Sequence, residues 1–318
     1  MAKSRGLEAA LEQVKALQRL ETLESADVEA LRKVVKGKYS FAIAPATKVI
    51  IEHRLTQLIP DLISTFERML INAEKSDPGC KAKWAIANTL YQLEQPDADL
   101  FLSGIRHVQL EPVCGGSEDT APNLRSLCAL GLVQANYYDV MNELADLLVD
   151  PSPEARAGAA RAIGYSENPA GVPLLRLKMN ISDREPSVLS ECFIATLKLS
   201  DDRTKVFEAL ENGTEQVQEL AAIALSEARI PGTFEAIRQQ WKKTRSPELR
   251  QSFLLSIAIL RADEATDFLV DLVARGNPQD ATDAFMALDI YKQTTDVWQQ
   301  VESAVKQRSD DSIAKLCR

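Results

Sequence analysis

Apolar residues recur along this chain with the spacing of one face of a helix. In the stretch DPSPEARAGAARAIG at 150–164, Ala155, Ala159, Ala160 and Ile163 fall at offsets 0, +4, +5 and +8. This spacing predicts a helix with one inward stripe of small and branched side chains. An Asp–Pro pair precedes the stripe and a glycine ends it, as is typical of helix boundaries.

The same offsets return at intervals along the sequence. The first positions of the other stripes are Ala82, Leu124, Val188, Val217, Leu249 and Ala281. From Leu124 onward, with Ala155 included, the steps are 31, 33, 29, 32 and 32 residues. Amphipathic stretches precede the later helices, at 140–149, 172–179, 203–210, 234–243 and 265–274. A near-constant period of this kind predicts antiparallel helical hairpins that stack and share one core.

The repeated stretches resemble those of the HEAT-repeat proteins, especially the shorter bacterial kind also seen in phycobilin lyases. The likeness is carried by DPSPEARAGAARAIG and by an acid six places before a base, as in Asp77–Lys83, Asp119–Arg125 and Asp150–Arg156. In that family the acid and the base link successive repeats, whereas Leu189, Gln218 and Thr282 hold the basic place in later copies here. The resemblance covers roughly Asp61–Arg308. It implies an all-α fold, an α-solenoid of stacked antiparallel helical hairpins in a HEAT-like superhelix.

We expect three parts in the chain. Residues 1–58 hold N-terminal capping helices and an irregular first repeat, residues 59–308 hold the HEAT-like repeats, and residues 309–318 form a C-terminal tail. The step from Ala82 to Leu124 is 42 residues, so this repeat carries an inserted loop, at 106–122. Binding residues often lie on such loops. The candidates are His107, Glu111, Cys114, Gly115 and Gly116.

Charge and composition narrow the functional classes. The net charge of −9 opposes general binding to nucleic acid or to anionic membranes. Residues 28–58 nevertheless carry six basic and two acidic side chains, either as a docking patch for an acidic partner or a phosphate, or as a solvated helix face. An odd number of cysteines without a CxxC pair indicates a reducing compartment. The N-terminal stretch reads as an amphipathic helix, so we expect a cytoplasmic location.

Little in the sequence points to catalysis. There are only two histidines, His53 and His107, and no phosphate-binding glycine motif occurs. The spacing of His107, Cys114 and the nearby carboxylates matches no familiar metal site. We therefore expect no catalytic, cofactor-binding or metal-binding residues.

In each hairpin, the helix that carries the stripe is the second one. Its position +6, counted from the first stripe residue, suggests where a partner binds, because this position points roughly opposite the inward stripe. In a HEAT-like stack these helices line the concave side. The positions form either an exposed apolar strip for a partner helix or peptide, or a buried contact between neighbouring helices. They are Asn88, Leu130, Arg161, Ile194, Ile223, Leu255 and Ala287, with Trp84 and Tyr91 as aromatic anchors at one end.

Three functions follow as hypotheses. The first is a non-catalytic HEAT-repeat scaffold or adaptor that binds a partner protein through its concave face and inserted loop. The resemblance also implies a second, a bilin lyase-like or chaperone-like helper of a tetrapyrrole protein. The third is a HEAT-like nucleic-acid-binding or DNA-repair protein, which needs a basic groove with aromatic side chains and a catalytic acid. The second helices from Leu124 onward hold few basic residues for that role.

Overall fold

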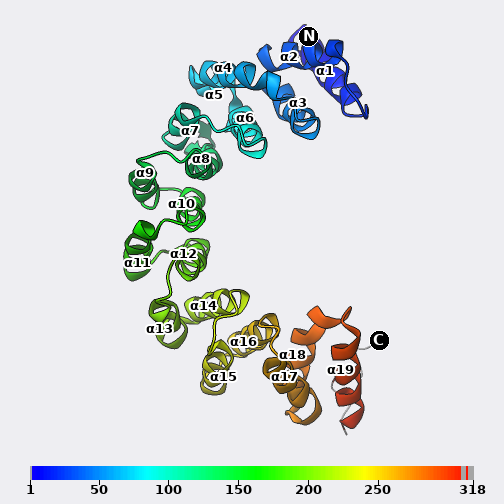
Figure 1. Cartoon of the computed structure of the whole chain (residues 1–318), viewed down its shortest axis with the longest axis vertical. Coiled ribbons are helices and arrows are strands. Elements are labelled where there is room, and N and C mark those ends of the chain that lie inside the picture. The colour runs from blue at the N-terminus through cyan, green and yellow to red at the C-terminus, as the bar shows by residue number, and fades with distance from the viewer. Residues whose placement is uncertain (1, 309–312, 314–318) are drawn as a thin grey trace. The chain divides into compact units, whose positions relative to one another are not determined.

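The computed structural model describes residues 2–308 and residue 313 of the 318-residue chain. The chain divides into two compact units, Met1–Leu174 (unit 1) and Leu175–Arg318 (unit 2). Within each unit, helices pair as antiparallel hairpins and the hairpins stack (Figure 1). The predicted all-α fold of stacked hairpins is thus confirmed in each unit, apart from one β-hairpin among the described residues. The superhelix and the three-part division remain predictions, and most of the 309–318 tail lies outside the described residues.

Unit 1 contains two layers of helices. It begins with α1 (Ala2–Leu17), α2 (Ser25–Lys36), α3 (Ser40–Glu52), α4 (Ile59–Leu70) and the short α5 (Ala73–Ser76). It continues with α6 (Lys81–Gln92), α7 (Ala98–Ile105), β1 (Leu110–Val113), β2 (Gly116–Asp119), α8 (Pro122–Gln134), α9 (Val140–Leu147) and α10 (Pro153–Tyr165). Helices α3, α6, α8 and α10 pack side by side in one layer, which we call the second-helix layer. Helices α4, α7 and α9 form the other layer, to the left of α6, α8 and α10 in Figure 1.

Unit 2 repeats this arrangement. Helix α11 (Val172–Ile181) runs across the division between the units, and α12 (Pro186–Leu199), α13 (Thr204–Asn212), α14 (Glu215–Glu227) and α15 (Thr233–Lys243) follow. The unit ends with α16 (Pro247–Ile259), α17 (Asp263–Arg275), α18 (Pro278–Ala287) and α19 (Thr295–Gln307). Helices α12, α14, α16 and α18 form its second-helix layer. In the described part of the chain, no helix combines the length and the apolar character needed to cross a membrane.

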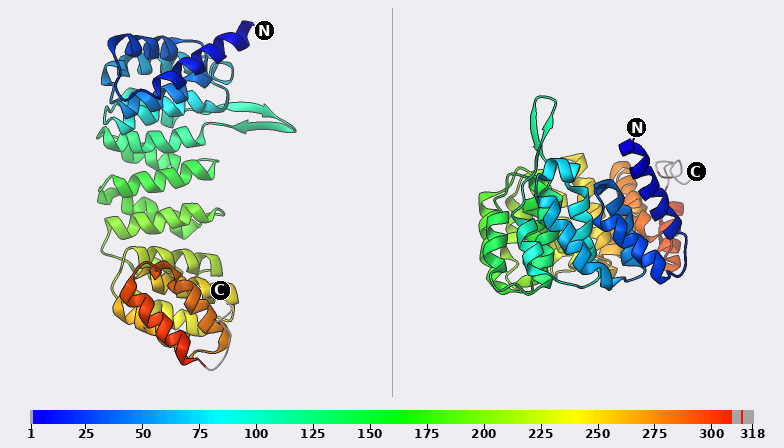
Figure 2. Two further views of the ribbon diagram at one scale, coloured as in Figure 1. Left: turned by 90° about the vertical axis from the view of Figure 1, so that its right-hand side faces the viewer. Right: turned by 90° about the horizontal axis from the view of Figure 1, so that it is seen from above.

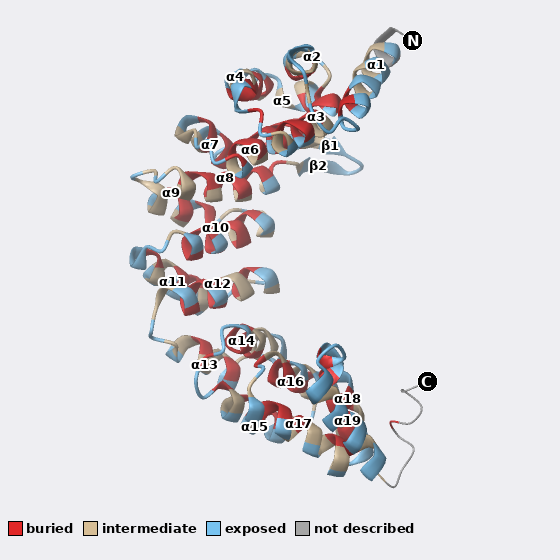
Figure 3. Cartoon of the chain, turned by 45° about the vertical axis from the view of Figure 1, so that its right-hand side comes forward, coloured by how far each residue is buried: buried red, intermediate tan, exposed pale blue. Residues whose placement is uncertain are grey.

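The predicted stripes form the core between the two layers of each unit. Ala155, Ala159, Ala160 and Ile163 are fully buried in α10, and buried residues follow the facing sides of the helices (Figure 3). The stripe in the last copy is interrupted, because Met286 is 40% exposed. The α-helix ends one residue later at Ala287 and continues as a 3-10 turn, which changes the direction of the side chains.

Small residues let neighbouring second helices approach closely. Gly158 of α10 faces α8 across such a contact. A Cβ atom on Gly158 would lie 2.7 Å from the Cα of Ser126, closer than non-bonded carbon atoms pack. The alanine-rich composition of α10 is thus explained by the short distance to α8.

Two of the predicted acid–base pairs form within their own repeats in unit 1, and one of them extends to the next repeat. Lys83 Nζ lies 3.1 Å from Asp77 Oδ2, and both side chains are buried. Arg125 contacts Asp119 at 2.7 Å and Asp150 at 2.8 Å, so one guanidinium joins two repeats. In unit 2, Arg250 holds the same place in its helix and contacts Asp280 at 2.7 Å. In unit 2, therefore, a base in one repeat still pairs with an acid in the next repeat. The acid lies directly before the stripe of that repeat, so the six-residue spacing did not predict this pair.

Candidate functional site

The inserted segment is a β-hairpin that projects from unit 1 (Figure 2). The expectation of a loop is therefore corrected. Strands β1 and β2 pair antiparallel, with Val113 opposite Gly116, and Cys114 and Gly115 make a two-residue turn. Gly115 has a φ of +97°, which glycine adopts without strain. The sequence signal was present, since side chains alternate in character before a double glycine.

Hydrogen bonding in the hairpin decides which backbone groups face outward. In an antiparallel pair, directly opposite residues alternate between bonded and non-bonded pairs. The Thr120 N–H donates to the Gln109 carbonyl at 2.9 Å, which makes this a bonded pair. By the observed register, the pairs Glu111–Glu118 and Val113–Gly116 are then bonded as well. The residues between them direct their backbone N–H and C=O groups toward the outer edges.

The two edges of the hairpin therefore differ. On β1 the outward positions are Leu110, which has an N–H, and Pro112, which has none, so this edge keeps one of two donors. On β2 the outward positions are Ser117 and Asp119, each with an N–H and a carbonyl. An unpaired strand edge with both groups is a template for another strand. The hairpin is thus fully open to pairing along β2, whereas β1 offers one donor fewer.

One face of β1 is apolar and exposed. Val108 and Leu110 are each 57% exposed, and Pro112 continues the row, because alternate residues share a face. The opposite face, with Gln109 and Glu111, is directed at the body of unit 1. The hairpin therefore presents apolar surface that adds nothing to the core.

The hairpin is fixed at its base by Glu111. The Gly79 N–H (2.6 Å), Gln109 Nε2 (2.6 Å) and Thr120 Oγ1 (2.9 Å) all donate to Glu111 Oε1. Gln109 Nε2 also donates to the Asp77 carbonyl at 2.8 Å. Partial burial raises the pKa of Glu111, but these hydrogen bonds outweigh that effect and hold the pKa below its usual range. The network ties the hairpin to the turn before α6.

This network predicts a dependence on pH. Because the pKa of Glu111 is lowered in the folded chain, its contribution is present above the ordinary carboxyl pKa and is lost as pH falls through the lowered value. We expect Glu111→Gln to lower stability by about 1–2 kcal/mol at pH 7. In the wild type the protection factor of the Gly79 amide against hydrogen exchange should fall as Glu111 is protonated, and the variant should lack this fall. Equal exchange profiles in both proteins between pH 3 and 7 would contradict this role.

The remaining loop candidates do not converge. His107 is half-buried at the base, where Nε2 lies 3.2 Å from Gln109 Oε1 and burial lowers its pKa. Cys114 is exposed at the tip with Gly115 and Gly116, which have open space around them. Among the described residues, no group of three or more potential ligands is placed to hold a metal ion. Glu111 is the loop candidate with a clear structural role.

A pocket of about 470 Å³ lies beside the base of the hairpin. It is formed by α3, the 3-10 turn Pro78–Cys80, the start of α6 and the start of α8. Trp84, an expected aromatic anchor, lines it and is 40% exposed. Its other lining residues are Ala44, Gly79, Cys80, Lys81, Thr120, Asn123 and Leu124. Sequence reasoning found only Trp84 here, because the others come from four separate segments.

The +6 positions lie on the surface of the second-helix layers. In unit 1, Asn88 and Leu130 are half-buried and Arg161 is exposed, and the expected anchor Tyr91 is half-buried as well. In unit 2, Ile194 and Leu255 are 38% and 39% exposed and Ile223 is half-buried. Ala287 is the exception, with 4% exposure. The buried alternative is therefore wrong for Arg161, Ile194 and Leu255, whereas Asn88, Leu130 and Ile223 are partly covered. The role of these positions in binding stays a prediction.

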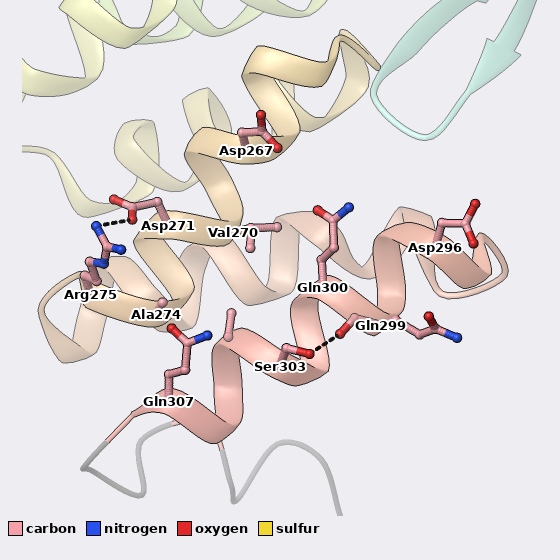
Figure 4. Close-up of a pocket in the computed structure, with 11 residues that line it drawn as sticks. Asp267, Val270, Asp271, Ala274, Arg275, Asp296, Gln299, Gln300, Ser303 and Gln307 are labelled. Atoms are coloured by element: carbon pink, nitrogen blue, oxygen red, sulfur yellow. Dashed lines mark hydrogen bonds and ion pairs between the residues drawn. The ribbon is translucent and has the colours of Figure 1, made fainter.

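Unit 2 contains a pocket with mostly polar lining residues (Figure 4). It has about 640 Å³ and lies between α17 and α19. Asp271 contacts Arg275 at 3.1 Å, and Ser303 Oγ donates to the Gln299 carbonyl at 2.9 Å. These groups thus serve their own helices rather than a common chemical centre.

The basic segment 28–58 is partly neutralised. Arg32 Nε lies 2.8 Å from Asp61 Oδ2, and Lys36 Nζ lies 3.3 Å from Asp61 Oδ1. Arg32 also pairs with Glu29 on its own helix. Two of its six basic side chains therefore support packing of α2 on α4, which favours the interpretation as a solvated helix face.

Among solved structures, the fold of this chain is similar to that of a protein complex. The complex of CpcE and CpcF of phycocyanin lyase from Nostoc sp. PCC7120 aligns with a TM-score of 0.40 and 16% identity, over 75% of this chain and 94% of that chain. No protein-family description matches the sequence, and no curated protein does.

Proposed function

We propose that this chain is a non-catalytic scaffold that binds another protein through the β-hairpin and the second-helix layer of unit 1. The observation that carries the proposal is the hairpin itself. It is fixed at its base by the Glu111 hydrogen bonds, yet it exposes Val108 and Leu110 and leaves the β2 edge unpaired. An ordered element with exposed apolar surface and no role in the core is typical of an interaction site.

The manner of binding follows from the edges. An extended segment of the partner adds as a third strand along β2, where Ser117 and Asp119 offer backbone donors and acceptors. Two strands alone are marginally stable, and a third strand strengthens the sheet. Pro112 favours pairing along β2 because it removes one of the two outward donors of the other edge.

The environment of the thiols supports a non-catalytic role. Burial raises the pKa of Cys80 and Cys192 to about 12, and it raises the pKa of Cys128 as well. These thiols stay protonated at neutral pH and are poor nucleophiles. Cys114 is exposed at the hairpin tip, away from His107 at the base.

Replacement of Ser117 by proline tests the proposal. The substitution removes the outward N–H of β2 without removing a bond within the hairpin, so we expect partner affinity to fall at least tenfold, or about 1.4 kcal/mol. The partner is first isolated by affinity purification from the producing cells and identified by mass spectrometry. Its affinity for each variant is then measured by calorimetry.

Ser117→Ala is the matched control, since it keeps the N–H and should bind like the wild type. Circular dichroism should show the same helix content in all three proteins. If the chain is purified alone every time, or if Ser117→Pro binds as tightly as Ser117→Ala, the proposal fails.

The two alternatives from the sequence make other predictions. A helper of a tetrapyrrole protein should give visible absorbance after mixing with an open-chain tetrapyrrole. A nucleic-acid-binding protein should retard DNA in a gel at low salt. We expect neither result, because the proposed contact is made by a strand edge and apolar side chains.

A further inference from the structure

We propose that the pocket beside Trp84 receives an apolar side chain from a partner segment whose flanking residues are acidic. This inference rests on the proposed protein-binding function and adds the chemistry of the partner. It is carried by the cavity, by its aromatic wall and by the charges around it.

The cavity is large enough for a side-chain anchor. Its volume is about 470 Å³, within the range of about 300–1,000 Å³ that is usual for ligand sites. Ala44, Leu124 and the indole of Trp84 give it apolar walls, while Lys81, Thr120 and Asn123 add polar groups. A few polar groups among apolar walls are typical of sites that orient a ligand.

The aromatic residues around the pocket favour an apolar guest. Trp84 is 40% exposed, although burial of so large a side chain from water is favourable. Phe41 is 53% exposed and lies one turn before Ala44 on α3, on the same side of that helix. Exposed tryptophans beside a cavity are frequent energetic centres of interfaces.

The basic side chains around the pocket favour acidic residues on either side of the bound apolar side chain. Lys81 is the charged member of the lining, and Lys48 lies one turn after Ala44 on α3. The pocket also borders the first turns of α6 and α8, where the helix dipole is positive.

The carboxylates nearby already have partners. Asp77 is paired with Lys83, Asp119 with Arg125, and Glu111 accepts the three hydrogen bonds at the hairpin base. The charges of Asp77 and Asp119 are therefore offset by Lys83 and Arg125, whereas Glu111 is hydrogen-bonded to neutral donors and keeps its charge on the hairpin side. On the other sides of the pocket, Lys81 and Lys48 are exposed basic side chains.

The surface beyond the pocket favours a polypeptide over a compact molecule. From Trp84, the exposed side of α6 continues through Asn88 and Tyr91, which are spaced one turn apart and half-buried. A chain anchored in the pocket can therefore continue along α6 and gain contacts there.

Fluorine NMR of protein labelled with 5-fluorotryptophan tests the proposal. The chain has three tryptophans, and Trp84→Phe assigns the signal of Trp84 against those of Trp241 and Trp298 in unit 2. The probe is the capped peptide Asp-Glu-Phe-Leu-Asp-Glu. The comparison peptides replace its acidic residues by Lys and Arg, or its Phe-Leu pair by two alanines.

We expect the acidic apolar peptide to shift the Trp84 signal alone, with half-saturation below about 1 mM. Each comparison peptide should bind at least about fivefold more weakly. Lys81→Glu should reverse the preference from the acidic to the basic peptide, whereas Lys75→Glu, an exposed position in the same unit, should not. No shift of the Trp84 signal at millimolar peptide, or an equal response to the basic peptide, overturns the proposal.

The pocket and the strand edge can be tested separately. Ser117→Pro should leave the peptide titration unchanged, because Ser117 does not line the pocket. If the peptide fails to bind while Ser117→Pro still releases the natural partner, only the pocket assignment is wrong. If both experiments fail, the proposed function is wrong as well.

Discussion

Replacement of Lys83 by methionine is expected to lower the free energy of unfolding by about 3–5 kcal/mol. Lys83 and Asp77 have exposures of 0% and 1%, so the substitution leaves a buried carboxylate without its cation. Asp77 also accepts the N–H groups of Ala82 and Lys83 at 2.9 Å, which fixes it at the start of α6. It therefore cannot turn out to water without loss of the helix cap. Urea denaturation followed by circular dichroism measures the change.

The matched control is Lys81→Ala, two residues earlier on an exposed position. It should change stability by no more than about 0.5 kcal/mol. The double variant Asp77→Asn, Lys83→Met removes both charges and should recover part of the loss. A loss below about 1 kcal/mol for Lys83→Met would show that Asp77 finds another partner.

Gly158→Ala should destabilise the chain by about 1–3 kcal/mol, although alanine is the better helix former. Helix propensity alone predicts a gain of about 1 kcal/mol. The new methyl group, however, would meet the backbone of α8, with the Ser126 Cα at 2.7 Å. The helices α8 and α10 must then move apart, and their shared core loses contacts.

Thermal denaturation distinguishes the two effects by their sign. The compensating variant Gly158→Ala, Ser126→Gly removes the Ser126 side chain that the methyl group would meet, so it should recover part of the loss. A higher melting temperature for Gly158→Ala would mean that the close approach of these helices is not required.

The helices could be predicted from the sequence because burial imposes a period on it. Each second helix has to place residues such as Ala155 and Ile163 on one side, and that requirement repeats with every hairpin. The stretch predicted at 140–149 is α9, at Val140–Leu147, and the stretch at 234–243 lies within α15, at Thr233–Lys243. The division between Leu174 and Leu175 had no such signal, since it falls within α11.

The candidate site was harder to predict, because residues that stay exposed need no regular spacing along the sequence. Val108 and Leu110 alternate with polar residues, but they cover no core, so the helical pattern simply stops there. Trp84 was found by its size and its place on the helix. The rest of its pocket comes from positions as distant as Ala44 and Asn123, and only the fold brings them together.

The position of Cys114 makes the hairpin open to direct observation. A thiol reagent at pH 8 should react at this exposed tip, because Cys80, Cys128 and Cys192 are buried and their raised pKa values keep them protonated. If Cys317 is replaced by serine, a single dye or spin label can be attached to the hairpin at Cys114. Binding of a partner to the hairpin should then reduce the rotational freedom of the label, which can be followed in real time.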